Sequence, residues 1–233
     1  MRSTRILACL SALIPLIAMG QGEPPRSPFS NRQSTLGVGL ELDVPLDEFD
    51  HAGTERFVGL SANFTTPARL LPFDYGFDFA YGVMGTRSAR VNVPFDSLDE
   101  EGELTVKCKM YSYMGQVRLR PFNGRVSPYV EGMIGLRQFT ARTGLDLDSS
   151  VDPVTWDRKA NSWTGAYGWA AGVLVGFGTS FYVEGRVERL WGGRASYVDP
   201  NSITISETGA VTYGTLSSAT DVVNIHLGIG LRF

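Results

Sequence analysis

Apolar residues alternate with polar or small residues through most of the chain, most clearly at its C-terminal end. Six apolar residues occupy every second position from Val223 to Phe233, and Asn, His, Gly and Arg fill the gaps. The same period of two runs from Leu36 to Val44. This period is typical of a β-strand with one apolar and one polar face. We therefore predict a strand at each end of the folded domain.

Six further segments between these two show the same alternation. They cover residues 58–64, 73–83, 111–119, 130–136, 167–177 and 181–187, which makes eight predicted strands in all. The connections after successive strands are 13, 8, 27, 10, 30, 3 and 35 residues long. Long and short connections therefore alternate, as they do in outer-membrane barrels with long extracellular loops and short periplasmic turns.

The second face of these strands carries charges and glycines. An eight-stranded barrel is just wide enough for side chains to fill its interior, and an unpaired ion there costs several kcal/mol. We therefore expect the inward charges to pair in a closed polar plug, although a gated ion path would use the same residue types. The twelve charges are Glu41, Asp43, Asp74, Asp78, Glu131, Glu184 and Glu188, together with Arg118, Arg120, Arg137, Arg186 and Arg232.

Aromatic residues gather at two levels of the predicted strands. Phe64, Phe73, Phe122, Phe177, Phe181 and Phe233 lie at the short-turn end, while Tyr81, Tyr111, Trp163, Tyr167 and Trp191 lie toward the other end. Amphipathic rings at two levels indicate the interfacial girdles of a membrane barrel. Aromatic residues that plug the ends of a soluble barrel are the alternative interpretation.

Two segments carry a resemblance to a known family. Residues 223–233 resemble the C-terminal signal that bacterial outer-membrane proteins present to their insertion machinery, and Val117-Arg-Leu-Arg-Pro-Phe122 followed by Pro128–Gly135 resembles the periplasmic hairpin of small barrels. The chain thus resembles the OmpA/OmpX-like transmembrane barrels, without the second domain of outer-membrane protein A. The resemblance implies an all-β, eight-stranded antiparallel up-and-down transmembrane barrel. It also implies an insertion signal formed by Phe233, Leu231 and Ile229.

The first twenty residues have the layout of a secretory signal peptide. Arg2 and Arg5 precede an apolar stretch over residues 6–18, and small residues at 18 and 20 suit a cleavage site. The apolar stretch is too short to span a bilayer. We predict a signal peptide over residues 1–20, a flexible periplasmic leader over 21–33, and a barrel over 34–233 in the bacterial outer membrane. Both ends of the barrel would be periplasmic.

Composition removes several other classes. Hydrophobic residues make up 43% of the chain, which is too many for a disordered protein. No later run of 18 apolar residues predicts a membrane helix. Removal of residues 1–20 leaves 19 basic and 24 acidic groups, a net charge of −5, so nucleic acid is not an expected partner. Cys108 is then the single thiol, and no disulfide is expected.

Catalytic chemistry finds little support in the residue pattern. The chain has two histidines, His51 in an acidic first loop and His226 within the last strand, without a serine in phase beside it. Nucleophilic catalysis needs a base within hydrogen-bond reach of the nucleophile. We predict no enzyme and no cofactor, while a serine that converges from another strand would permit a lipid-modifying enzyme.

Metal binding is also not expected. Asp146, Asp148, Ser150, Asp152 and Asp157 have the spacing of a calcium loop, but Val151 stands where that loop needs glycine. We interpret this segment as a solvated acidic loop. The acidic segment 96–103 would attract divalent ions that bridge lipopolysaccharide.

Two features depart from the simple strand pattern. Arg189 shares the phase of apolar Phe181 and Val187, so it either lies near the outer headgroups, where a lipid phosphate pairs with it, or follows a bulge that reverses the phase. Residues 202–213 predict a hairpin, with its turn at 207–209, that extends the last two strands. Ten spanning strands are the alternative.

Three functions fit these patterns. The first is a structural or surface-interaction protein whose extracellular loops contact an unidentified ligand, outer-membrane lipids and lipopolysaccharide. The second is a narrow pore, and the third is a lipid-modifying enzyme. The rival fold is a soluble, secreted lipocalin-like barrel with an apolar interior.

Overall fold

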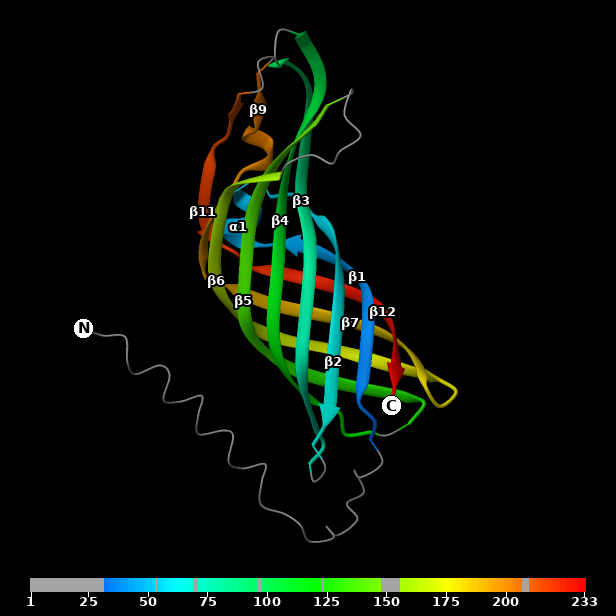
Figure 1. Cartoon of the computed structure of the whole chain (residues 1–233). Helices are drawn as coiled ribbons and strands as arrows, with labels where there is room; N and C mark the ends of the chain where they lie inside the picture. Colours follow the sequence, from blue (N-terminus) through cyan, green and yellow to red (C-terminus); the bar gives the residue numbers. More distant parts are fainter. Residues whose placement is uncertain are drawn as a thin grey trace, which may run out of the picture.

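The computed structural model describes residues 32–52, 54–68, 71–95, 98–122, 124–147, 156–206 and 210–233. The predicted signal peptide and most of the predicted leader lie outside the described residues. Eight strands close an antiparallel barrel in the order β1-β12-β7-β6-β5-β4-β3-β2 (Figure 1). The predicted eight-stranded antiparallel barrel is confirmed, and the alternative of ten spanning strands is wrong.

Neighbouring strands of the barrel follow one another along the chain, and β1 closes the barrel against β12. The barrel strands are β1 (Thr35–Pro45), β2 (Phe57–Pro67), β3 (Phe73–Phe95), β4 (Leu98–Leu119), β5 (Val126–Leu147), β6 (Trp156–Phe177), β7 (Phe181–Gly192) and β12 (Val222–Arg232). Helix α1 (Asp47–His51) follows β1, and a segment between β7 and β12 contains β8 (Arg194–Val198), η2 (Pro200–Ser202), β9 (Thr204–Ile205), β10 (Val211–Thr212) and β11 (Thr215–Ala219).

Strands β3 to β6 are about twice as long as the other four. They contain 22 or 23 residues, whereas β1, β2, β7 and β12 contain 11 or 12. Since a membrane-spanning strand needs only about 9–11 residues, the surplus forms a four-stranded sheet that projects beyond one rim of the barrel (Figure 1). We call this sheet the extension. The prediction of long loops over residues 84–110 and 137–166 is therefore wrong for their described parts.

The two rims of the barrel differ. At the short-turn end, β2 connects to β3, β4 to β5 and β6 to β7, and Gly178 adopts a positive φ of 66° in the last of these turns. The chain ends also meet there, because the Ser34 amide donates to the Phe233 carbonyl over 2.9 Å and the Phe233 amide donates to the Ser34 carbonyl over 3.1 Å. Figure 1 shows the C-terminus at the rim opposite the extension.

The exterior of the barrel carries a continuous belt of apolar side chains. Phe77, Ile134 and Leu227 are 73%, 72% and 65% exposed, whereas buried acidic and basic side chains lie in the interior. This arrangement is inside out relative to a soluble barrel, so the rival fold with an apolar interior is wrong. The belt comprises Leu36, Val38, Leu40, Val58, Leu60, Phe77, Val117, Val130, Ile134, Leu136, Val187, Ile225, Leu227 and Ile229.

Within the described residues, no helix is long and apolar enough to cross a membrane.

The segment between β7 and β12 folds into two ribbons. Strand β8 pairs with β11, and β9 pairs with β10 through Ile205 and Val211. The predicted hairpin over residues 202–213 is therefore present in its described part, while its predicted turn at 207–209 lies outside the described residues. The β8–β11 ribbon prolongs the β7–β12 pair but forms a separate sheet.

Candidate functional site

Two buried arginines, Arg118 on β4 and Arg186 on β7, organise the centre of the lumen. Arg118 pairs with Glu131 through Nε over 2.8 Å and with Glu184 through Nη2 over 2.9 Å. Arg186 pairs with Glu131 through Nη1 over 3.1 Å and with Asp78 through Nη2 over 2.7 Å. Because Glu131 touches both guanidiniums, one network joins β3, β4, β5 and β7 across the interior.

Arg186 also neutralises an acidic cluster formed by Glu41, Asp78 and Glu188. Its Nη2 lies 2.6 Å from Glu188 Oε1 and 3.6 Å from Glu41 Oε1. One oxygen of each acid lies within 4.8 Å of the others, a spacing that would suit a metal ion. The guanidinium already contacts all three carboxylates, so the cluster holds its own cation.

Two buried tyrosines lie in the lumen beside this network. The Arg118 guanidinium stacks over the Tyr129 ring at 3.8 Å from its centroid, and the Tyr129 hydroxyl donates to Glu184. A Cβ added at Gly172 would come within 2.4 Å of the Tyr129 hydroxyl, so this ring needs glycine on the facing wall. The second is Tyr182, which is also buried. Sequence reasoning missed the inward tyrosines, and the glycines on the same face of the strands are the signal that could have found them.

A second ion-pair group closes the short-turn end. Asp74 is fully buried and pairs with Arg32 over 2.9 Å and with Arg120 over 3.0 Å. Arg32 also donates to the carbonyls of Ala68 over 3.3 Å and Phe73 over 3.2 Å. Sequence analysis placed Arg32 in the leader and missed this role. The inward acid at Asp74 was the one signal that a cation was needed there.

The remaining predicted charges lie near the two rims of the lumen. Arg137 is fully buried and donates to the Thr220 carbonyl over 2.6 Å, and Asp43 is also buried. Arg232 differs, because its side chain is only half-buried at the short-turn rim, with its guanidinium 5.7 Å from the centroid of Tyr182. Eleven of the twelve charges predicted to face inward are thus buried in the structure.

His226 meets a serine from another strand inside the barrel. Ser61 Oγ on β2 lies 2.8 Å from His226 Nδ1, and Glu41 Oε1 lies 3.6 Å from the same nitrogen. A catalytic triad places the serine and the acid on different ring nitrogens. Here both partners crowd Nδ1, and Nε2 faces Gly228, where an added Cβ would come within 2.5 Å. The three residues are also buried, so the arrangement differs from a catalytic triad in both geometry and access.

The extension end of the lumen is closed by an apolar plug, which we call the cap core. Phe49 on α1 is fully buried, with its ring centroid 6.1 Å from that of Phe139 and 5.3 Å from that of Tyr197, both edge-on. Val106 and Cys108 on β4 pack into the same cluster. This segment was predicted only as an acidic first loop, and the plug was not predicted. His51 itself is exposed, with Nδ1 2.6 Å from the Asp47 carbonyl oxygen.

Ion pairs tie α1 to β7 and β8 around the cap core. Arg189 Nη2 lies 3.3 Å from Asp47 and 3.4 Å from Asp221. Arg194 pairs with Glu48 over 2.9 Å. Strand β7 pairs in unbroken register with β6 and β12 at Arg189, so the bulge interpretation is wrong. Arg189 faces outward, as its phase predicts, but carboxylates of the protein neutralise it.

The predicted girdle residues lie on the outward side of the barrel, at its two levels. Phe181 and Phe233 are 63% and 64% exposed at the short-turn end, and Trp163 and Tyr167 are 50% and 61% exposed toward the extension. The residues of the predicted insertion signal, Ile229, Leu231 and Phe233, are exposed on the belt side of β12 and at its end.

Two acidic segments cannot be placed in full. Of the predicted calcium-like residues, Asp148, Ser150 and Asp152 lie outside the described residues, while Asp146 is exposed near the end of β5. Of the acidic segment 96–103, residues 98–103 belong to β4, which corrects their assignment to a loop, and residues 96–97 lie outside the described residues.

Comparisons with known proteins find likeness in structure only. No family model matches the chain, and no curated protein matches its sequence. Three solved structures that it resembles are outer-membrane proteins. The attachment invasion locus protein Ail of Yersinia pestis, solved with the heparin analogue sucrose octasulfate, is 17% identical with a TM-score of 0.43 over 87% of this chain and 99% of Ail.

The other two are a major outer membrane protein of Thermus thermophilus and OprG of Pseudomonas aeruginosa. The first is 9% identical with a TM-score of 0.46, over 86% of this chain and 99% of its own. OprG is 15% identical with a TM-score of 0.43, over 90% of this chain and 99% of its own. These likenesses concern the fold alone. The chain is an eight-stranded antiparallel β-barrel with an apolar exterior and a charged lumen, the architecture that its resemblance to small outer-membrane barrels predicts.

Proposed function

We propose that this chain is a bacterial outer-membrane protein with a closed lumen. The protein acts at the cell surface through its extension and through the surface around the cap core. In this proposal the short-turn end and both ends of the barrel face the periplasm, and the extension faces outward. Its role is structural or surface-interacting, and the partner contacts strands β3 to β6 where they pass beyond the membrane.

The observation that carries the proposal is the closed lumen. Ion pairs fill one part of it, and apolar side chains fill the other. The ion-pair network of Arg118 and Arg186 crosses the middle, and the cap core around Phe49 fills the extension end. An ion that passes through would have to separate buried pairs, and breaking one such pair costs about 3–5 kcal/mol. A barrel built this way has its accessible chemistry outside the lumen.

The extension offers that accessible surface. Arg87, Ser88, Arg90 and Glu103 lie on its strands beyond the belt, and Arg87, Ser88 and Glu103 are exposed. A rigid sheet presents such side chains in fixed positions, unlike a long loop, which loses conformational entropy when it binds. The predicted signal peptide, the insertion signal at Phe233 and the belt support delivery to the outer membrane by the insertion machinery, with lipopolysaccharide around the outer girdle.

A shortened extension tests the surface role. Arg87 and Val106 are cross-strand partners, so replacing residues 88–105 by Asn-Gly joins them through a two-residue hairpin turn. We expect cells that display this variant to lose adhesion to a cultured epithelial monolayer, while an unheated sample still migrates as a folded barrel on a gel.

The β9–β10 hairpin provides a matched control for that variant. Replacing residues 205–211 by Asn-Gly joins the partners Thr204 and Thr212 and leaves the extension intact. We expect adhesion to be retained in this control. Equal adhesion by the full chain and by the shortened extension, at equal surface amounts, would contradict the surface role.

A narrow pore is the second candidate function, because charged residues continue through the lumen from Asp74 to Asp43. Recording from planar bilayers that contain the purified full chain distinguishes the two. We expect no conductance steps, since the luminal arginines Arg118 and Arg186 already contact carboxylates. Reproducible single-channel steps from the unmodified chain would favour the pore.

A further inference from the structure

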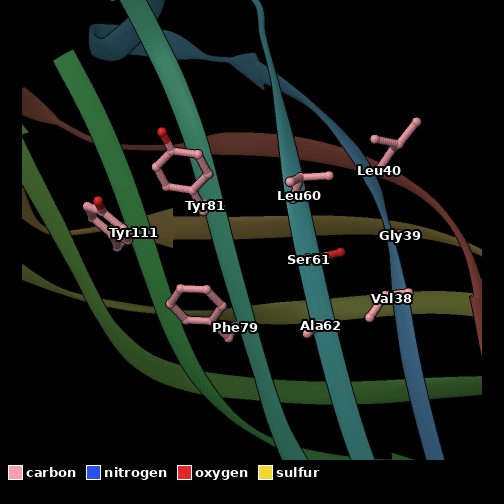
Figure 2. Close-up of a pocket in the computed structure, with 9 residues that line it drawn as sticks. All are labelled: Val38, Gly39, Leu40, Leu60, Ser61, Ala62, Phe79, Tyr81 and Tyr111. Carbon is pink, nitrogen blue, oxygen red and sulfur yellow. The ribbon is translucent and has the colours of Figure 1, made fainter. Parts of the chain in front are cut away.

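A hollow interrupts the apolar belt between β1 and β4. Val38, Leu40, Leu60 and Phe79 line it together with two tyrosines (Figure 2). Its floor is low because Ala62 stands in register between Val38 and Phe79, where the belt otherwise carries large side chains. A concave apolar strip on the lipid-facing side fits an acyl chain more closely than a flat belt does.

Two tyrosine hydroxyls mark the end of the hollow nearest the extension. Tyr81 and Tyr111 are cross-strand partners with ring centroids 5.2 Å apart. Figure 2 shows both hydroxyls pointing away from Phe79 and toward the cap side. The hollow therefore changes from apolar to polar where the outer girdle meets the extension, as an acyl chain changes to a headgroup.

Cationic side chains follow directly above these tyrosines. Lys109 is the next outward residue of β4 after Tyr111, and its Nζ lies 5.4 Å from the centroid of the Tyr81 ring. Arg142 on β5 pairs in register with Lys107 and so lies diagonal to Lys109, about 7–8 Å away between backbones. On the same face of β4 the acidic Glu103 is six residues further along, about 20 Å away.

A cation on the other side of the outer girdle has different neighbours from Lys109. Arg189, on the opposite side of the barrel, contacts the carboxylates of Asp47 and Asp221. Lys109 instead lies over an aromatic ring, which does not neutralise its charge as a carboxylate would. Along β1–β5, the acyl-shaped hollow is thus followed by a pair of hydroxyls and then by cations. This order is complementary to an anionic lipid.

We propose that this hollow binds the lipid A portion of lipopolysaccharide, with one acyl chain along Ala62 and a phosphate between Lys109 and Arg142. The inference rests on the proposed function, because the extension must face outward for the tyrosines to lie in the outer leaflet. It deepens that function by assigning a lipid site to one face of the barrel.

The test measures binding of purified bisphosphorylated lipid A to the detergent-purified full chain by native mass spectrometry. Each basic residue near a membrane surface contributes about 1 kcal/mol to the binding of anionic lipid, or about fivefold. We therefore expect Lys109→Ala with Arg142→Ala to weaken binding by about 25-fold, and removal of the lipid phosphates to weaken binding to the unmodified chain similarly. Phosphatidylglycerol should bind more weakly than lipid A.

A filled hollow tests the acyl-chain contact. Ala62→Trp should weaken binding at least severalfold, whereas Ala171→Trp, which adds the same side chain to the outward face of β6, should not. Each variant must still migrate as a folded barrel in an unheated gel sample. Unchanged lipid A binding by both the double variant and Ala62→Trp would overturn the inference, as would equal binding of phosphatidylglycerol.

Cell fractionation separates this inference from the proposed function. Recovery of the chain in the outer membrane together with unchanged lipid A binding by the variants would overturn the lipid site alone. Recovery in the soluble periplasm would overturn the proposed function, and the lipid site with it.

Discussion

At the scale of single residues, Arg186 does more than any other described side chain to neutralise the lumen. It is fully buried and touches four carboxylates, those of Glu41, Asp78, Glu131 and Glu188. Such a group stabilises the fold only while its partners are present, because each charge was desolvated on folding. Removing the guanidinium leaves several buried anions near one another.

We predict that Arg186→Leu destabilises the barrel by about 3–5 kcal/mol, the range for breaking a buried ion pair. The free energy of unfolding is measured by urea titration in lipid vesicles, with tryptophan fluorescence as the signal. Arg194→Leu is the control, since its pair with Glu48 is exposed and such pairs are worth about 0–1 kcal/mol. Equal stability of the two variants would contradict the central role of Arg186.

The contact between Ser61 and His226 leads to a prediction of the opposite kind. Because both Ser61 Oγ and Glu41 approach His226 Nδ1, the acid does not lie on the second ring nitrogen, where a catalytic triad needs it. We expect cells that express Ser61→Ala or His226→Gln to have the same lipid A and phospholipid composition, by mass spectrometry, as cells with the unmodified chain. A modified lipid that depends on both residues would restore the enzyme hypothesis.

The period of two predicted the inward side of each luminal charge but none of its partners. Phase along one strand assigns a side, whereas Ser61 and His226 meet only because β2 and β12 both pair with β1 in a particular register. The same limit hid the contact of Arg32 with Asp74, since residue 32 precedes the first alternating segment. Cross-strand stagger decides these contacts, and a single sequence does not display it.

At the scale of elements, the barrel strands were predictable and the extension was not. Where a strand crosses the belt, its outward face must be apolar, so apolar and polar residues alternate clearly over residues 73–83. Beyond it, polar residues such as Thr86, Ser88 and Arg90 follow, and the register shift between Val83 and Gly85 moves the following residues to the other phase. An irregularity of this kind breaks the period on which a strand prediction depends.

Helix α1 illustrates an element that packing stabilises against its own propensity. It has five residues, no side-chain cap and a positive φ at Asp47, so it would not persist alone. The burial of Phe49 among Phe139 and Tyr197 supplies the stabilisation. A short acidic segment therefore becomes a plug because of one aromatic side chain.

We predict that Phe49→Ala releases α1 while leaving the barrel intact. Truncating a buried phenylalanine costs about 3–5 kcal/mol, which exceeds what such a short helix can supply. Backbone amides of α1 should then exchange with solvent far faster, as measured by hydrogen exchange, while amides of β1 and β12 keep their protection. Phe122→Ala is the control, because Phe122 is 61% exposed. Unchanged exchange at α1 would show that the ion pairs of Arg189 and Arg194 hold the helix.

At the scale of the whole molecule, the interior divides into a charged half and an apolar half. Ion pairs fill the lumen at the level of the belt, where the outside is most apolar, and the cap core fills it where the barrel meets the extension. At the level of the belt, where the exterior is apolar, the charged side chains thus lie inside. Near the extension, where the exterior is polar, the apolar side chains lie inside. Composition averages over both halves and conceals them.

This polarity gives the molecule a direction that can be measured. Thr179 is exposed in the β6–β7 turn at the short-turn end, and Thr212 is exposed on β10, in the segment that joins β7 to β12 at the other end. Cys108 is buried in the cap core and should stay unreactive in the folded protein, so a cysteine introduced at either threonine reports that end of the barrel alone.

We predict that Thr212→Cys reacts with a membrane-impermeant maleimide on intact cells and that Thr179→Cys does not. After the outer membrane is permeabilised, both variants should react, because both positions are exposed. The unmodified chain should remain unlabelled in both conditions. Labelling of Thr179→Cys alone on intact cells would mean that the extension faces the periplasm. In that case the surface role would be wrong, although the closed lumen would stand.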